Sequence, residues 1–204
     1  GSQGVLLDEN FGFFPHVTGS TTTFANADEI LAECNFTGLC ERIGVIRSYM
    51  TRHGNGPLVT EIHNSPVVEQ HNKTTEWAGR FRVGYLDLVA LRYALAVCGG
   101  VDALAITHMD QWKQFGKVCT AYYRQYGEDS EEDEFLRTGG TRIQPPPKVD
   151  LAYMARLTSA MNKFYVPHLE DFWSNPAEMI SEWLQAPLCL TSYGPMLTDK
   201  KWHG

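Results

Sequence analysis

The clearest periodic pattern in the chain is a helical stripe near its middle. Between Leu88 and Cys98, apolar side chains recur at helical spacing and so share one face. Asp87 precedes this stretch and is predicted to cap it, and Gly99-Gly100 ends it. The pattern predicts a helix that packs its apolar face into a core.

Other helices are expected where capping residues or prolines precede apolar positions, and short apolar runs between them predict strands. The helices are expected from Asn26-Ala27-Asp28 onward, over Leu39–Met50, from about Val149-Asp150 with Leu151, Met154, Leu157 and Met161 on one face, and after Asn175-Pro176. The strands are expected at Val5–Leu7, Leu58–Ile62, Leu104–Ile106, Lys117–Tyr123 and Leu188–Leu190. This alternation favours an α/β fold, a layered sheet with flanking helices.

Two polar tetrads follow two of these apolar runs, more than eighty residues apart: Thr107–Asp110 and Ser192–Pro195. Strand ends are where α/β sheets place ligands. Asp110 could accept hydrogen bonds from the ring N–H and exocyclic amine of a purine. Ser192 and Gly194 could approach the other edge of such a base. Each tetrad taken singly also fits an ordinary turn at a strand end.

A long polar and basic loop is expected from His63 to Gly84, and loops of that length in a compact domain are often functional. Arg80 and Arg82 lie in it, and a guanidinium group can grip a carboxylate through two hydrogen bonds. The alternative is a pair of solvated surface arginines.

Composition narrows the class of protein. The chain has 204 residues, 43% of them hydrophobic, enough to bury one sizeable core. Its net charge of -7 argues against a surface that coats nucleic acid. The acidic run over 128–134 fits a solvated loop.

The spacing of cysteines and histidines and the lengths of the apolar runs argue against a metalloprotein and a membrane protein. Five widely spaced cysteines, with no CxxC pair, are expected to be buried thiols in a reducing cytoplasm. The seven histidines lack metal-ligand spacing, so we expect no protein-bound metal. No run approaches eighteen apolar residues, so neither a membrane span nor a signal peptide is expected.

Six motifs in chain order resemble those of the adenylosuccinate synthetase family. They are Gly1–Asp8, Pro15–Thr18, Thr51–Pro57, Gly84–Asp87, Thr107–Asp110 and Ser192–Pro195. The resemblance implies that residues 1–204 are the C-terminal portion of a single domain of that family. The family's N-terminal phosphate loop, with its catalytic acid and magnesium ligands, has no counterpart here, so no catalytic residue is expected in this portion.

That family phosphorylates the 6-oxygen of a purine nucleotide and then lets the amine of L-aspartate displace the phosphate. By resemblance, Gln3 would hold the 6-oxygen region and Thr18 the nucleotide's phosphate. His53 and Gly54 would lie against the ribose, and Arg80 would also reach this purine monophosphate.

The resemblance also implies sites for the other two substrates. L-Aspartate would be bound by Thr74, Thr75, Gly79, Arg80 and Arg82, although Glu76-Trp77-Ala78 intervenes where the family has no such insertion. The nucleoside triphosphate would be bound by Arg82, His108, Asp110, Ser192, Gly194 and Pro195. Since His108 stands where the family carries lysine, ATP or dATP is open beside GTP. Mg²⁺ would be held mainly by the N-terminal part and the nucleotide.

These departures look most like the bacteriophage branch of the family, the 2-aminoadenylosuccinate synthetases. Such enzymes use dGMP, aspartate and ATP to make a diaminopurine DNA precursor. The alternatives are ordinary adenylosuccinate synthesis from IMP with GTP, a non-catalytic nucleotide-binding module, and a structural subunit. The resemblance further implies a homodimer in the cytoplasm, which is the host cytoplasm if a phage encodes the chain.

Overall fold

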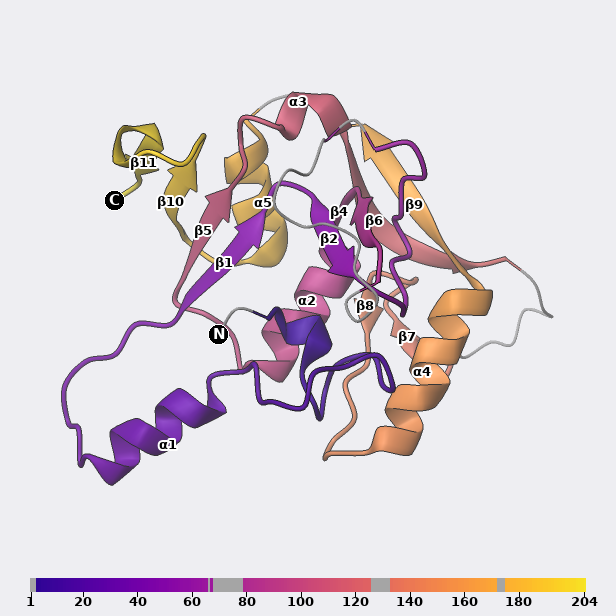
Figure 1. Cartoon of the computed structure of the whole chain (residues 1–204), viewed down its shortest axis with the longest axis horizontal. Coiled ribbons are helices and arrows are strands. Elements are labelled where there is room, and N and C mark those ends of the chain that lie inside the picture. The colour runs from indigo at the N-terminus through magenta and orange to yellow at the C-terminus, as the bar shows by residue number, and fades with distance from the viewer. Residues whose placement is uncertain (1–2, 66, 68–78, 126–132, 172–174) are drawn as a thin grey trace.

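The computed structural model describes residues 3–65, 67, 79–125, 133–171 and 175–204. It is a mixed α/β fold in which helices flank several small sheets (Figure 1). The helices are α1 (Ala25–Glu33), α2 (Leu88–Val97), α3 (Trp112–Phe115), α4 (Leu151–Lys163) and α5 (Pro176–Leu184), with short 3-10 turns η1 (Val5–Leu7) and η2 (Leu197–Asp199). The predicted fold class is confirmed.

The largest sheet has the order β1-β5-β10-β11, with bounds Ile43–Arg47, Ala103–Thr107, Leu188–Ser192 and Lys200–Trp202. Its first three strands are parallel and β11 is antiparallel to β10. A second sheet has the order β4-β6-β9, with bounds Leu86–Asp87, Lys117–Arg124 and Tyr165–Asp171. Two hairpin-like pairs complete the set: β2 (Met50–His53) with β3 (Phe81–Gly84), and β7 (Leu136–Arg137) with β8 (Arg142–Ile143).

Helix α2 lies between the two larger sheets and contributes to a core on each side. Its Leu88 packs with Leu104 of β5 and Ile180 of α5. Its Tyr93 packs in a second cluster with Met154 of α4. The leucines of the predicted stripe therefore pack in the first cluster, and the other face of α2, with Tyr93, packs in the second.

Local capping explains the helices that were predicted well. The Asp87 carboxylate accepts a hydrogen bond from the Ala90 amide at 3.0 Å and begins α2. Asp150 does the same for Tyr153 at 2.9 Å and begins α4. On α4, Met154, Leu157 and Met161 are buried, whereas Leu151 is exposed.

The helix predicted over Leu39–Met50 is wrong, because β1 lies inside that segment and β2 begins at its last residue. The backbone of Ile43–Arg47 pairs in parallel with β5, a partner sixty residues further along the chain. Ile43 and Val45 on this edge strand are exposed. Long-range pairing has therefore overridden a weak local preference for helix.

Several smaller expectations also need correction. Val5–Leu7 forms a 3-10 turn and not a strand edge. The segment Leu58–Ile62 is a turn with one isolated bridge, between Glu61 and Gly84. The expected loop up to Gly84 ends in strand β3. Cys34 and Cys40 are exposed, so not every thiol is buried.

Candidate functional site

The two polar tetrads lie side by side at the carboxyl ends of β5 and β10 (Figure 1). These strands pair in parallel, and the Met109 amide donates to the Ser192 carbonyl at 3.0 Å. The structure thus brings together two segments that the sequence separates by more than eighty residues. This is the edge of a parallel sheet where α/β proteins bind ligands.

The first tetrad is fixed by contacts from the loop after β1. The Ser48 hydroxyl donates to the His108 carbonyl at 2.6 Å. His108 has a φ of 59°, and its Nδ1 lies 3.0 Å from the Thr107 hydroxyl. Its ring meets the Tyr49 ring edge-on at 5.6 Å between centroids. Asp110 is exposed at the end of this ordered turn.

The second tetrad is organised around the carbonyl of Gly194. That oxygen accepts from the Ser192 hydroxyl at 3.1 Å and from Lys200 Nζ at 2.5 Å. A Cβ on Gly194 would lie 2.5 Å from an oxygen of the Asp199 side chain, so a larger residue would displace that carboxylate. Pro195 is exposed beside it. The sequence analysis missed Lys200 and Asp199, which hold this turn.

A glycine turn after β2 forms a separate candidate site. Two guanidinium groups hold three successive carbonyls of this turn. Arg82 donates from Nε to Gly54 at 2.9 Å and from Nη2 to Gly56 at 2.6 Å. Arg52 donates from Nε to Asn55 at 2.9 Å. The turn is therefore shaped by side chains from both strands of the β2–β3 pair.

These two arginines face each other across that pair in register. Burial, and then the neighbouring Arg82 guanidinium, lower the pKa of Arg52 to about 10. The pKa of His16, whose carbonyl accepts from Arg52 Nη2 at 2.7 Å, is also lowered by burial, Arg52 and Arg82. Like charges held this close favour an anion between or beside them.

One carboxylate partly balances these charges. Glu61 forms ion pairs with Arg80 at 2.8 Å and with Arg82 at 2.7 Å. Within the described part of the chain, no other ion pair to Arg52, Arg80 or Arg82 is found. Among the described residues, three guanidinium groups against one carboxylate leave a surplus of positive charge at the turn, suited to an anionic ligand.

The aspartate loop predicted from the sequence reaches this same turn. Gly79 has a φ of 70°, and a Cβ on it would lie 2.9 Å from the Gly54 Cα. The Gly54 amide donates to the Arg80 carbonyl at 3.0 Å. Thr74 and Thr75 lie outside the described residues. Gly79, Arg80 and Arg82 thus all lie against the glycine turn.

The residues expected to bind the purine monophosphate do not all lie at the glycine turn. The Nε2 atom of His53 is buried and has no hydrogen-bond partner among the described residues. Thr18 is half-buried, two residues after the His16 carbonyl that Arg52 holds. Gln3 is exposed near the start of the chain. His53 therefore directly precedes the glycine turn, whereas Thr18 contacts Leu7 and Ser20.

Sequence reasoning assigned no role to Arg52 or Glu61. Arg52 stands inside the quoted motif Thr51–Pro57, where a charged residue beside glycines was the available signal. Glu61 lies in the segment predicted as a strand, where a carboxylate is expected to face solvent and so suggested no role. Their importance follows from the pairing of β2 with β3, which no local pattern reveals.

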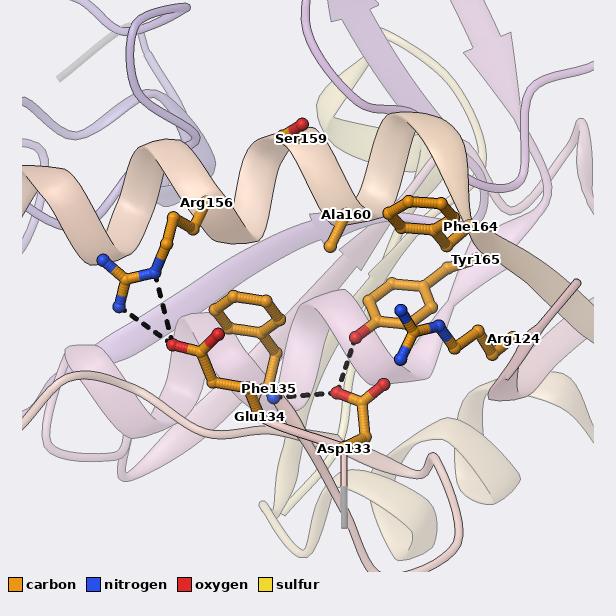
Figure 2. A pocket seen from close by; sticks show the side chains of 9 residues that line it. All are labelled: Arg124, Asp133, Glu134, Phe135, Arg156, Ser159, Ala160, Phe164 and Tyr165. Atoms are coloured by element: carbon orange, nitrogen blue, oxygen red, sulfur yellow. Dashed lines mark hydrogen bonds and ion pairs between the residues drawn. The ribbon is translucent and has the colours of Figure 1, made fainter. Parts of the chain in front are cut away.

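A cavity of about 240 Å³ lies elsewhere, between α4 and the segment after residue 132 (Figure 2). Inside it, Arg156 pairs with Glu134 at 2.8 Å, and the Tyr165 hydroxyl donates to Asp133 at 2.6 Å. Arg124 lies over the Phe164 ring. Its charged groups are already matched within the chain, and no predicted site residue lines it.

The described residues form neither a metal-binding cluster nor a membrane-spanning helix. No group of three or more His, Cys, Asp or Glu there is arranged to hold a metal ion. No described helix is long and apolar enough to cross a membrane.

The fold and these two sites define an α/β protein that presents a positively charged turn and a pair of ordered loops at a sheet edge. A family model of adenylosuccinate synthetase matches residues 1–199. The adenylosuccinate synthetase of Chlorobium chlorochromatii is 33% identical over 210 positions, covering 96% of this chain and 45% of that protein. That of Aquifex aeolicus is 30% identical, covering 99% and 47% respectively. The chain belongs to the adenylosuccinate synthetase family.

A solved structure supports the fold. The fully ligated adenylosuccinate synthetase from Plasmodium falciparum superposes with a TM-score of 0.65 at 21% identity, covering 98% of this chain and 48% of that one. The chain spans less than half the length of these relatives. The chain therefore corresponds to part of the fold of its relatives and not to their whole length.

Proposed function

We propose that this chain forms part of a synthetase that joins L-aspartate to the 6-position of a purine nucleotide, with hydrolysis of a nucleoside triphosphate. The observation that carries the proposal is the surplus of positive charge that the described residues leave at the glycine turn, where Arg80 and Arg82 pair with Glu61 and Arg52 lies opposite Arg82. The substrates of such a reaction are anions, and a fixed cationic site both binds and orients them.

The two arginines of the aspartate loop differ in how many of their nitrogens already donate hydrogen bonds and in how exposed their side chains are. Three nitrogens of Arg82 already donate to Gly54, Gly56 and Glu61, and its side chain is 13% exposed. Arg80 donates through one nitrogen to Glu61, and its side chain is 64% exposed. We therefore assign the direct grip on the aspartate carboxylate to Arg80, and the support of the turn to Arg82.

The other expected contacts of aspartate and of the purine monophosphate are part of the same proposal. Thr74 and Thr75 would add hydroxyl contacts to aspartate. Thr18 would hold the phosphate, and the segment around His53 and Gly54 would lie against the sugar. Gln3 would hold the 6-oxygen region through its amide.

We assign the triphosphate's base to the paired loops at the sheet edge. The exposed Asp110 carboxylate would accept from the base, and the His108 ring would lie against it. Ser192, Gly194 and Pro195 would border the opposite edge of the base. Mg²⁺ would arrive with the triphosphate, and we assign it no ligand from the described residues of this chain.

Among acceptors we favour dGMP, with the chain in the bacteriophage branch, a homodimer and the host cytoplasm as its setting. IMP with GTP is the alternative, and it agrees with the names of the relatives found. A nucleotide-binding module without catalysis is the second alternative.

The test is release of phosphate by the complete product of the gene that encodes this chain. Aspartate is supplied, and dGMP or IMP as acceptor is crossed with ATP or GTP as donor. Aspartate-dependent release with dGMP supports the favoured branch, and release with IMP alone supports ordinary adenylosuccinate synthesis. Silence in all four combinations, with nucleotide binding retained, supports the non-catalytic module.

A further inference from the structure

Glu61 is the residue of this region that no functional expectation includes, yet it touches both arginines of the aspartate loop. Its two carboxylate oxygens are divided between them, Oε1 to Arg80 at 2.8 Å and Oε2 to Arg82 at 2.7 Å. Its side chain is 18% exposed. One partly buried carboxylate thus links a well-anchored guanidinium to an exposed one.

The backbone places Glu61 firmly opposite strand β3. The isolated bridge joins it to Gly84, and the amide of the next residue, Ile62, donates to the Val83 carbonyl at 2.8 Å. The preceding Thr60 donates its hydroxyl to the Tyr85 carbonyl at 2.8 Å. Neighbours on both sides are therefore fixed, so the carboxylate has little freedom to leave the arginines.

The ion pair with Glu61 has a different effect on each of the two arginines. Arg82 is held independently by two carbonyls of the glycine turn, so Glu61 mainly neutralises its charge. Arg80 has Glu61 as its ion-pair partner among the described residues, and is otherwise open to solvent. An exposed ion pair adds little to stability, but it restricts a long side chain to one direction. Its consequence is orientation of the Arg80 guanidinium.

We propose that Glu61 is the positioning residue of the aspartate subsite: its carboxylate fixes Arg80 beside Arg82, leaving the free edge of the Arg80 guanidinium to receive a carboxylate of L-aspartate. This inference rests on the proposed function, because it names what sets the geometry of that function's aspartate contact. Glu61 itself touches no reacting atom.

Replacing Glu61 with glutamine tests the role. The amide keeps the size but presents a donor group to one of the arginines, so Arg80 is released. We expect the KM for aspartate to rise about tenfold, the factor for one charge-assisted hydrogen bond, with kcat and the KM of the purine nucleotide changing less than threefold. Glu61→Asp, which keeps the charge on a shorter stem, should fall between the wild type and Glu61→Gln.

Glu134→Gln is the matched control, because Glu134 also pairs with an arginine at 2.8 Å but lines the separate cavity beside α4. It should leave the KM for aspartate unchanged. A lower KM for aspartate in Glu61→Gln would overturn the proposal and show that Glu61 competes with the substrate. A fall in kcat together with similar rises in the KM of every substrate would also overturn it, because that result indicates a purely structural role.

Calorimetric binding of L-aspartate, with purine monophosphate and a non-hydrolysable triphosphate present, separates this inference from the proposed function. Wild-type protein that binds aspartate but never releases phosphate refutes the proposed reaction, and the Kd of Glu61→Gln still decides the role of Glu61. Tenfold weaker binding supports the positioning role, whereas unchanged binding refutes it. Wild-type protein that binds no aspartate refutes both. Circular dichroism confirms that each variant is folded.

Discussion

Asp87 offers the sharpest physical prediction, because it is a fully buried carboxylate with two defined partners. It caps α2 through the Ala90 amide, and the Tyr122 hydroxyl donates to it at 2.6 Å. Burial outweighs these hydrogen bonds and raises its pKa to about 6. Asp87 belongs to the family-like motif Gly84–Asp87, and its contacts are all internal, so its role there is structural.

The raised pKa makes the folded protein less stable as the pH rises. A folded state that holds a proton more tightly than the unfolded chain gains stability below the unfolded pKa of 3.8, and loses it as the pH passes through about 6. A difference of about two pH units corresponds to about 3 kcal/mol in the free energy of unfolding, as an upper bound. The Asp87 contribution should therefore decline between pH 4 and pH 6.5.

Urea unfolding of the wild type and of Asp87→Asn across pH 4–7 measures this contribution. Asparagine caps a helix as well as aspartate does, but does not titrate. The difference in unfolding free energy between the two proteins should therefore shift by about 3 kcal/mol in favour of asparagine as the pH rises. Asp150→Asn, at the exposed cap of α4, lacks the burial and is the control. Parallel pH curves for the wild type and Asp87→Asn would refute the reasoning.

Two further substitutions probe the glycine turn. Gly56→Ala should cost roughly 2–4 kcal/mol in urea unfolding, because φ is 104° and the new Cβ would meet the Arg52 guanidinium and, at 2.8 Å, the His16 Cβ. Gly139→Ala is the control, because Gly139 has a φ of 63° but a Cβ added there would meet nothing within 4 Å. A loss of more than about 2 kcal/mol in the free energy of unfolding of Gly139→Ala would contradict the steric argument. Arg80→Leu should raise the KM for aspartate roughly a hundredfold, the loss of two charge-assisted hydrogen bonds. An equal rise in the KM of the purine nucleotide would count against the assigned role.

How much could be predicted from the sequence depends on how local the signal is. Asp87 and the stripe that follows it lie within one helix, so cap and period together predicted α2 correctly. The strand Ile43–Arg47 depends on β5, sixty residues away, and its local pattern was taken for a helix. The paired polar tetrads were found because each one directly follows an apolar strand.

The charged site was predicted in part for the same reason. Arg80 and Arg82 stood out as guanidinium groups in a basic segment, and the family resemblance predicted that they bind a carboxylate. The sequence could not show that three nitrogens of Arg82 are already engaged within the chain. It also could not show Glu61 as their shared partner, since that contact requires the turn before it to fold against β3.

The most direct test of the central claim is whether the complete gene product transfers the nitrogen of aspartate to a purine nucleotide. The protein is incubated with ¹⁵N-labelled L-aspartate, dGMP or IMP, and ATP or GTP, and the nucleotides are analysed by mass spectrometry. The account predicts a product with the mass of the nucleotide plus aspartate less water, carrying the ¹⁵N label and strongly reduced in Arg80→Leu. Triphosphate hydrolysis with no labelled adduct of either nucleotide would contradict it.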